Sequence, residues 1–142
     1  MFNENTPKLF LLYFAVITLT GSSIALPDED AKRSTAELIA SKGYPVVQYA
    51  VMTKDHYNIT MQRIPGGRKG TRQWPKGGKP VAFLMTGLEC SSADFVVNLP
   101  HQSLGFILAD HGFDVWLGNV RGTQYSSHKW LSKENEAFWD FG

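Results

Sequence analysis

The sequence has little cysteine and little net charge, and each shortage excludes a class of function. Cys90 is the only cysteine among 142 residues, so neither an internal disulfide nor a cysteine-based metal site is possible. The 14 Lys and Arg residues nearly balance 13 Asp and Glu residues, and the net charge of +1 gives no electrostatic basis for nucleic-acid binding. The histidines lack metal-ligand spacing, and we expect each to be a surface or capping residue. They are His56, His101, His111 and His128.

A long hydrophobic run is also missing. The amino-terminal apolar stretch, Leu9 to Thr20, has 12 residues, whereas crossing a bilayer takes about 20. Lys8 precedes this stretch, and small residues at Ser23 and Ala25 fit a signal-peptidase site. We therefore expect a signal peptide at 1–25, entry into the secretory route, and no transmembrane segment after cleavage.

The remaining chain has globular composition, with 43% hydrophobic and 13% aromatic residues. Residues 26–33 are polar and predict a loose arm, and residues 34–142 predict one folded region. Ser34 and Glu37 have capping-box spacing and predict the start of a helix. Gly43 and Pro45 predict its end.

Two strands are predicted next. Val46 to Thr53 is rich in Val and Tyr, and Tyr57 to Gln62 alternates apolar and polar residues, so together they predict an antiparallel hairpin at a sheet edge. Asn58 and Thr60 fall on the polar face and belong to a glycosylation sequon, which makes Asn58 a candidate site. An unmodified strand asparagine remains equally open.

Val81 to Met85 is a short apolar run between Pro80 and Gly87, which predicts a strand buried on both faces of a parallel sheet. The preceding loop, residues 66–80, is basic and reads as a solvated connection, with docking to an anionic lipid surface as the alternative. Ser103 is placed to cap a helix over Leu104 to Asp110, and Phe113 to Leu117 is the next strand. Strand, helix and strand in this order predict a crossover unit of a parallel sheet.

The end of the chain has a different pattern. Ser132 is placed to cap a helical segment, Lys133 to Phe141. Its aromatics Phe138, Trp139 and Phe141 have no predicted partner, so we expect an exposed aromatic patch. The predicted fold class is α/β with an incomplete sheet.

A complete catalytic set is absent from the sequence. The Gly-x-Ser-x-Gly nucleophile elbow does not occur, and the similar segment around Ser103 lacks the buried strand that an elbow requires. Cys90 has no identifiable base, so we interpret it as a small loop residue. A self-sufficient esterase that uses Cys90 or Ser103 is the least favoured hypothesis.

Several ordered motifs together resemble the acid lipase family, which includes gastric and lysosomal acid lipases. The resemblance runs from about Ser34 to the last residue. The motifs are Glu37-Leu38-Ile39, Gly43-Tyr44-Pro45, Arg63-Ile64-Pro65, Gly87-Leu88, Asn98-Leu99-Pro100, the run Ser103 to Asp110, Gly112-Phe113-Asp114-Val115-Trp116, and Gly118-Asn119-Val120-Arg121-Gly122.

The resemblance implies the amino-terminal part of an α/β-hydrolase fold: an edge hairpin, the first parallel strands and a crossover helix. It implies hydrolysis of acylglycerol or sterol esters at a lipid–water interface, no cofactor, and a secreted or lysosomal location. The family's Ser-Asp-His triad would lie downstream of this chain, so no catalytic side chain is assigned here. The backbone N–H of Leu88 matches an oxyanion-hole donor.

Two matched positions near that donor carry further expectations. Thr86 stands where the family has histidine, which alters the support of the oxyanion loop but not its backbone donor. Arg121 is expected to pin loops by hydrogen bonding. We therefore expect a lipase segment that is inactive alone, with a short non-catalytic lipid-binding or lipase-interacting protein as the alternative.

Overall fold

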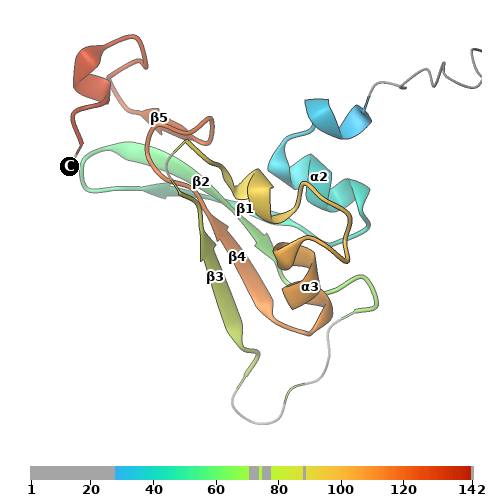
Figure 1. Ribbon diagram of the computed structural model, residues 1–142. Coiled ribbons are helices and arrows are strands. Elements are labelled where there is room, and N and C mark those ends of the chain that lie inside the picture. The colour runs from blue at the N-terminus through green and yellow to red at the C-terminus, as the bar shows by residue number, and fades with distance from the viewer. Residues whose placement is uncertain (1–27, 71–73, 75–77, 88, 142) are drawn as a thin grey trace, which may run out of the picture.

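The computed structural model describes residues 28–70, 74, 78–87 and 89–141 (Figure 1). The predicted signal peptide at 1–25 lies outside these residues. Within them, no helix has the length and apolar character needed to cross a membrane.

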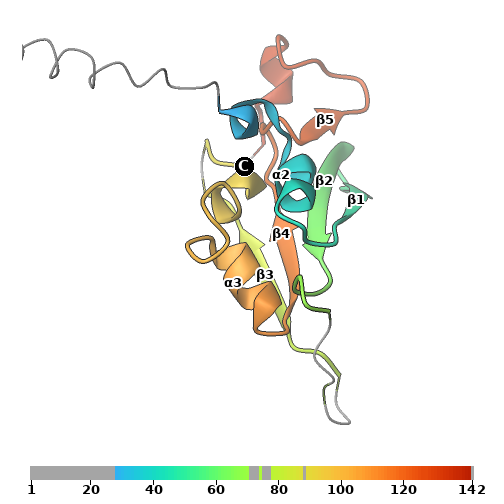
Figure 2. The ribbon, with the colours of Figure 1, turned by 90° about the vertical axis from the view of Figure 1, so that its right-hand side faces the viewer.

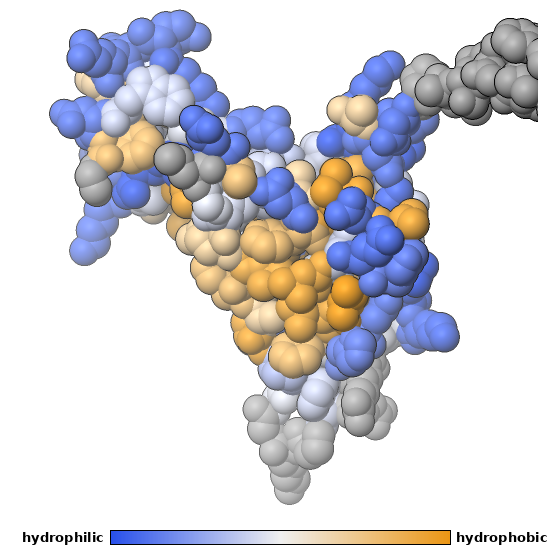
Figure 3. Space-filling model, viewed as in Figure 1, coloured by the Kyte–Doolittle hydropathy of each residue, from blue (hydrophilic) through white to orange (hydrophobic). Residues whose placement is uncertain are grey.

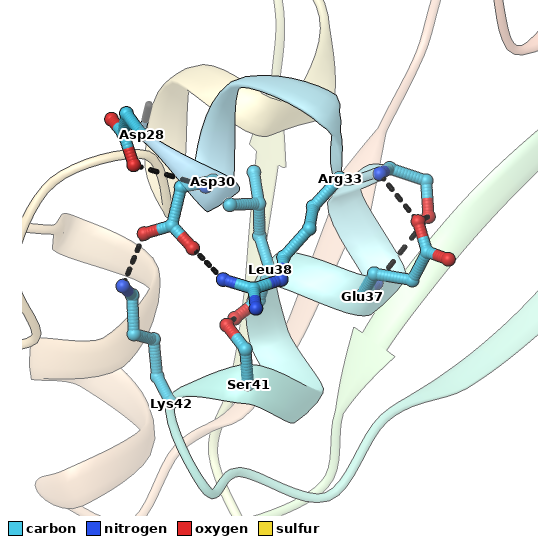
Figure 4. A network of polar contacts seen from close by, with 8 residues as sticks. Asp28, Asp30, Arg33, Glu37, Leu38, Ser41 and Lys42 are labelled. Atoms are coloured by element: carbon cyan, nitrogen blue, oxygen red, sulfur yellow. Dashed lines mark hydrogen bonds and ion pairs between the residues drawn. The ribbon is translucent and has the colours of Figure 1, made fainter. Parts of the chain in front are cut away.

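The described chain begins with a short 3-10 helix, η1 (Glu29–Lys32), where the sequence predicted only a loose arm. Asp28 caps it by accepting a hydrogen bond from the Asp30 backbone N–H at 3.0 Å. The Asp30 carboxylate forms ion pairs with Arg33 and with Lys42 (Figure 4). This carboxylate therefore joins the start of the chain to the end of the following helix.

Helix α2 (Thr35–Ser41) confirms the predicted capping box. The Ser34 hydroxyl accepts from the Glu37 N–H at 3.4 Å, and the Glu37 carboxylate accepts from the Ser34 N–H at 2.7 Å. Gly43 follows the helix with φ +81°, the left-handed conformation that glycine adopts without strain. Local sequence signals thus set both ends of this helix.

The described strands form one mixed sheet of order β1-β2-β4-β3, with β5 also paired to β2. β1 pairs antiparallel with β2, β2 with β4, and β3 parallel with β4. Helix α3 (Leu104–Asp110) connects β3 to β4, which confirms both the hairpin and the crossover unit. β5 was not predicted. The strands are β1 (Val47–Met52), β2 (Tyr57–Ile64), β3 (Val81–Met85), β4 (Asp114–Gly118) and β5 (Ser126–His128).

The core lies between one face of the sheet and the two α-helices, which both pack on that face (Figures 1 and 2). Ile39 of α2 and Phe106 of α3 are fully buried against Val115 and Leu117 of β4. The short helix η2 (Ser92–Phe95) closes the core between them and contributes partly buried Phe95.

The prediction that β3 is buried on both faces is wrong. Val81, Phe83 and Met85 are 63%, 53% and 52% exposed, while Ala82 and Leu84 pack toward the core. The reason is that both described α-helices cover the opposite face. Apolar side chains therefore gather on the surface over β3 and β4 (Figure 3).

The predicted orientation of β2 is also wrong. Asn58 and Thr60 were expected on the polar face, and the same alternation puts Gln62 with them, yet Gln62 is fully buried, as is Ile64 two residues later. Ile59 and Met61 lie on the alternate positions and are only partly buried. Gln62 faces inward because a buried polar cluster receives its side chain, as described below.

The carboxyl-terminal segment departs from its prediction as well. A 3-10 helix, η3 (Glu136–Phe138), replaces the predicted longer helix, and Asn135 rather than Ser132 caps it. Phe138 is 1% exposed because it packs against Tyr57, whose hydroxyl donates to the Phe138 carbonyl. Trp139 remains 48% exposed. Of the three aromatics in the expected patch, Phe138 is therefore buried, Phe141 is half-buried and Trp139 stays exposed.

Candidate functional site

The carboxyl ends of the parallel strands β3 and β4 lie side by side. Met85, the last residue of β3, is paired with Gly118, the last residue of β4. Thr86 and Gly87 leave β3 at this point, and Asn119 leaves β4. Ligand sites of open α/β sheets occur outside the carboxyl ends of the strands, which makes this edge the candidate site.

A cavity of about 770 Å³ opens at this edge, between the loops that follow the two strands. Polar groups from both loops and two aromatic rings from the chain end line it. The lining residues are Glu89, Cys90, Ser91 and Asp94 on one side, Val120, Arg121, Gly122, Thr123 and Gln124 on the other, with Trp139 and Phe141. The cavity thus joins polar groups to an apolar wall.

The expected oxyanion donor, Leu88, lies outside the described residues. Its neighbour Gly87 is exposed, and Glu89 adopts a left-handed conformation with φ +59°. The Cys90 N–H donates a hydrogen bond to the Gly87 carbonyl at 3.4 Å. Thr86 is 7% exposed, and its hydroxyl has no hydrogen-bond partner among the described residues.

The surroundings of the two alternative nucleophiles, Cys90 and Ser103, disfavour a catalytic role for either residue. Cys90 is exposed, and a hydrogen bond to Asp94 with the nearby negative charge raises the pKa of its thiol, which disfavours the reactive thiolate. Ser103 occupies the cap position of α3 as predicted, but its hydroxyl makes no capping bond. It donates instead to the Asn98 carbonyl at 2.9 Å and is buried.

Arg121 joins loops by hydrogen bonding, as the sequence predicted. Its guanidinium donates to one Asp55 carboxylate oxygen at 2.9 Å and lies 2.8 Å from the other. The same group lies over the Tyr57 ring, 5.3 Å from its centre. The hydrogen bond from Arg121 lowers the pKa of Asp55 to about 2. Arg121 therefore ties the rim of the cavity to the β1–β2 turn.

The histidines do not form a site. His56 has φ +67° and packs its ring against Trp130, 4.4 Å between centres. His128 accepts the Trp130 and Leu131 N–H groups, and His111 lies at the end of α3. Among the described residues, no three His, Cys, Asp or Glu side chains gather to hold a metal ion. Asn58, the candidate glycosylation residue, is half-buried between Met52 and Ser127.

A buried polar cluster lies beside the candidate site and was not predicted from the sequence. Asn119 lies at its centre, with Ser92 and Gln62 in direct contact and Thr35 and Tyr125 beyond them. A Gly-Asn pair directly after a buried strand was the available signal, because a polar side chain at a strand's carboxyl end often serves a site.

Comparisons with known proteins agree with this geometry. A family model described as a partial alpha/beta-hydrolase lipase region matches residues 35–99. The lipase lipl-5 of Caenorhabditis elegans is 47% identical over 134 residues, which cover 94% of this chain and 32% of the relative. Human lysosomal acid lipase/cholesteryl ester hydrolase is 45% identical over 123 residues, covering 86% of this chain and 30% of the relative. Mouse lipase member M is 46% identical over 115 residues, covering 80% and 27%.

This chain therefore spans about a third of the length of these relatives. The family-model match contains β3 and the loop that follows it, and the match to lipl-5 covers 94% of the chain. The chain therefore contains a match to the partial alpha/beta-hydrolase lipase region and is similar to lipases, lysosomal acid lipase among them, over most of its own length.

Proposed function

We propose that this chain is the amino-terminal segment of a secreted or lysosomal lipase that hydrolyses acylglycerol or sterol esters. The observation that carries the proposal is the loop after β3, which leaves a parallel strand at the cavity edge. In this proposal the Leu88 backbone N–H stabilises the oxyanion of the reacting ester, and the cavity receives the ester. The Ser, Asp and His of the triad come from downstream sequence.

The uncovered face of the sheet supports the segment proposal. β3 is the last strand of the sheet order, and its side chains Val81, Phe83 and Met85 face solvent. The relatives are about three times as long as the part that matches here. In the proposal, polypeptide equivalent to that remainder pairs with β3 and covers this face.

A chimera tests the function. Residues of this chain replace the matching 123 residues of human lysosomal acid lipase, and turnover of a fluorogenic fatty-acid ester is measured. We expect turnover by the chimera and none by the 142-residue chain alone, because a missing nucleophile costs about 10⁶-fold in rate.

Two results would contradict the proposal. One is a secreted, folded chimera without activity. The other is turnover by the chain alone together with labelling of Cys90 or Ser103 by an active-site reagent, which would restore the self-sufficient esterase. An inactive chimera combined with lipid-vesicle binding by the chain alone would favour the non-catalytic lipid-binding protein.

The Thr86 departure from the family pattern has its own test. The proposed donor is a backbone N–H, so replacing the Thr86 side chain leaves the donor in place. We expect Thr86→His in the chimera to change the turnover rate by less than about tenfold, the size of a 1.4 kcal/mol effect. A larger gain would mean that the histidine side chain is needed in the loop.

Secretion of the chain tests the processing proposals. We propose cleavage after Ala25 and an N-glycan on Asn58. Amino-terminal sequencing of the secreted product should begin at Leu26, and glycosidase treatment should reduce its mass. Asn58→Gln should abolish that mass change, and an unchanged mass in the parent chain would show that Asn58 stays unmodified.

A further inference from the structure

Two consecutive residues fix both ends of the connection between β3 and η2. At its start, Met85 is paired with Gly118 in the parallel ladder. At its end, the Ser92 backbone N–H donates to the Asn119 side-chain oxygen at 2.8 Å. The Gly118-Asn119 dipeptide therefore holds the residues on either side of this connection, Met85 through the ladder and Ser92 through a hydrogen bond.

The Asn119 side chain is itself held from the other side. Its amide nitrogen donates to the Thr60 carbonyl of β2 at 2.8 Å and to the Ser92 hydroxyl at 3.1 Å, with Gln62 Oε1 at 3.3 Å. Asn119 is 3% exposed, and Ser92 and Gln62 are fully buried. A buried amide with its donor and acceptor both engaged has one orientation, because any other leaves polar groups unsatisfied.

The connection has few other restraints among its described residues. Gly87, Glu89 and Cys90 are exposed, and the turn between Gly87 and Cys90 closes with a single long hydrogen bond. A donor that stabilises a transition state must be held in place before the reaction. On the carboxyl side of Glu89 and Cys90, the hydrogen bond at Ser92 is therefore the nearest buried restraint on the backbone.

We propose that Asn119 is a positioning residue for the loop after β3, whose described residues are 86–87 and 89–91. We call this loop the oxyanion loop. Its carboxamide clamps the start of η2 to β2 and thereby fixes the backbone that precedes Ser92. The role of this loop in ester hydrolysis rests on the proposed function. The clamp itself is a property of the chain and can be measured without turnover.

The single cysteine offers a reporter within the loop. The full chain is labelled at Cys90 with a trifluoromethyl group, and its fluorine NMR signal is recorded together with amide exchange at Glu89, Cys90 and Ser92. Asn119→Leu keeps the branching and the number of side-chain heavy atoms but removes every hydrogen bond of the clamp. We expect amide exchange at Ser92 to rise about tenfold, because its N–H loses the buried hydrogen bond to Asn119, with Glu89 and Cys90 changing less because they are already exposed. We also expect a shifted fluorine signal.

Ser92→Ala is the matched control. It removes the Ser92 hydroxyl from the same buried cluster but keeps the backbone N–H that Asn119 holds. We expect its loop signals to stay within about twofold of the parent, since the clamp bond survives. Exchange at Leu117, a fully buried residue of β4 between β2 and β3, reports global unfolding in every variant.

Three results would overturn the proposal. Asn119→Leu could fold without changing the loop signals, or Ser92→Ala could loosen the loop equally. If Asn119→Leu does not fold, the parent chain decides, because a clamped Ser92 amide must exchange as slowly as Leu117. Faster exchange at Ser92 would show that no clamp exists.

The chimera separates this proposal from the proposed function. If the parent chimera turns over ester, Asn119→Leu should lower kcat by about tenfold or more with a smaller change in KM, as for an interaction made in the transition state. An unchanged kcat would overturn the positioning role. An inactive parent chimera would contradict the proposed lipase function but not the clamp. The amide-exchange measurements would then test whether Asn119 holds the loop.

Discussion

The ion pair between Arg63 and Asp114 lies on the uncovered face of the sheet and is bidentate. Two guanidinium nitrogens lie 2.8 Å from the two carboxylate oxygens, and the guanidinium also lies over the Trp116 ring. The hydrogen bond from Arg63 holds the pKa of Asp114 below its ordinary value of 3.8. β2 and β4 are therefore joined by side chains as well as by their ladder.

This pair predicts a pH-dependent loss of stability in Asp114→Asn. Because the folded-state pKa is lowered, the pair stabilises the fold above about pH 4, and that stability is lost as pH falls toward the folded-state value. We expect the variant to lose about 1–3 kcal/mol of unfolding free energy at pH 7, as for a charged hydrogen bond. Urea denaturation at pH 7 and pH 3 measures both values.

At pH 3 the difference between parent and variant should shrink. The exposed Asp140→Asn substitution is the control and should change stability by less than about 0.5 kcal/mol at either pH. A constant difference across the pH range would mean that Asp114 acts through packing rather than charge.

The sequence alone could not predict which face of the sheet each polar side chain of β2 occupies. Alternation along β2 separates two sets of side chains but does not say which set faces the helices. Gln62 is inside because Ser92 and Asn119, both distant in sequence, supply its partners. Such partners become visible only when the topology is known.

At the scale of elements, prediction succeeded where local chemistry decides. The Ser34 capping box, the Gly43 helix end and the apolar β3 run all correspond to observed boundaries. The sequence did not predict β5, and it predicted a longer helix, Lys133 to Phe141, where the structure has the short helix η3. β5 forms by pairing with β2, and η3 packs Phe138 against Tyr57, so tertiary contacts decide both.

Close packing of α3 against η2 predicts the effect of Gly105→Ala. A Cβ atom at Gly105 would lie 2.9 Å from the Phe95 carbonyl oxygen and 3.0 Å from Val96 Cγ1. The carbonyl belongs to the backbone of η2 and cannot rotate away, so the two elements must separate. We expect a net loss of about 1–2 kcal/mol, since overpacking outweighs the helix propensity gained from alanine.

Thermal unfolding followed by circular dichroism measures this loss. Gly87→Ala is the control, because its added Cβ has no atom within 4 Å among the described residues other than its neighbours in the chain. It should change stability by less than about 0.5 kcal/mol. Equal unfolding temperatures for Gly105→Ala and the parent would show that η2 adjusts its position freely.

For the whole molecule, the sequence predicted the fold class but not its open side. The run Val81 to Met85 has the composition of a strand covered on both faces, and the structure covers one. In the proposed function, polypeptide equivalent to the rest of the relatives covers the second face of β3, which would account for this apolar composition.

The open side predicts self-association of the isolated chain. Val81, Phe83 and Met85 form a contiguous exposed apolar strip on β3, and Tyr49 and Trp116 stack on the same face, 4.9 Å between ring centres. β3 is also an edge strand, with one side of its backbone unpaired by any described strand. Exposed apolar edges of this kind pair with other chains.

Sedimentation velocity over a range of concentrations measures this association. We expect Phe83→Lys to raise the monomer fraction, because a charge on the apolar strip opposes both stacking and edge pairing. Leu99→Lys, at an exposed apolar residue of the loop before α3, is the matched control and should leave association unchanged. A monomeric parent chain at every concentration would contradict the prediction and would favour a natural short protein over a lipase segment. Equal effects of the two lysine variants would show that association depends on general hydrophobicity and not on β3.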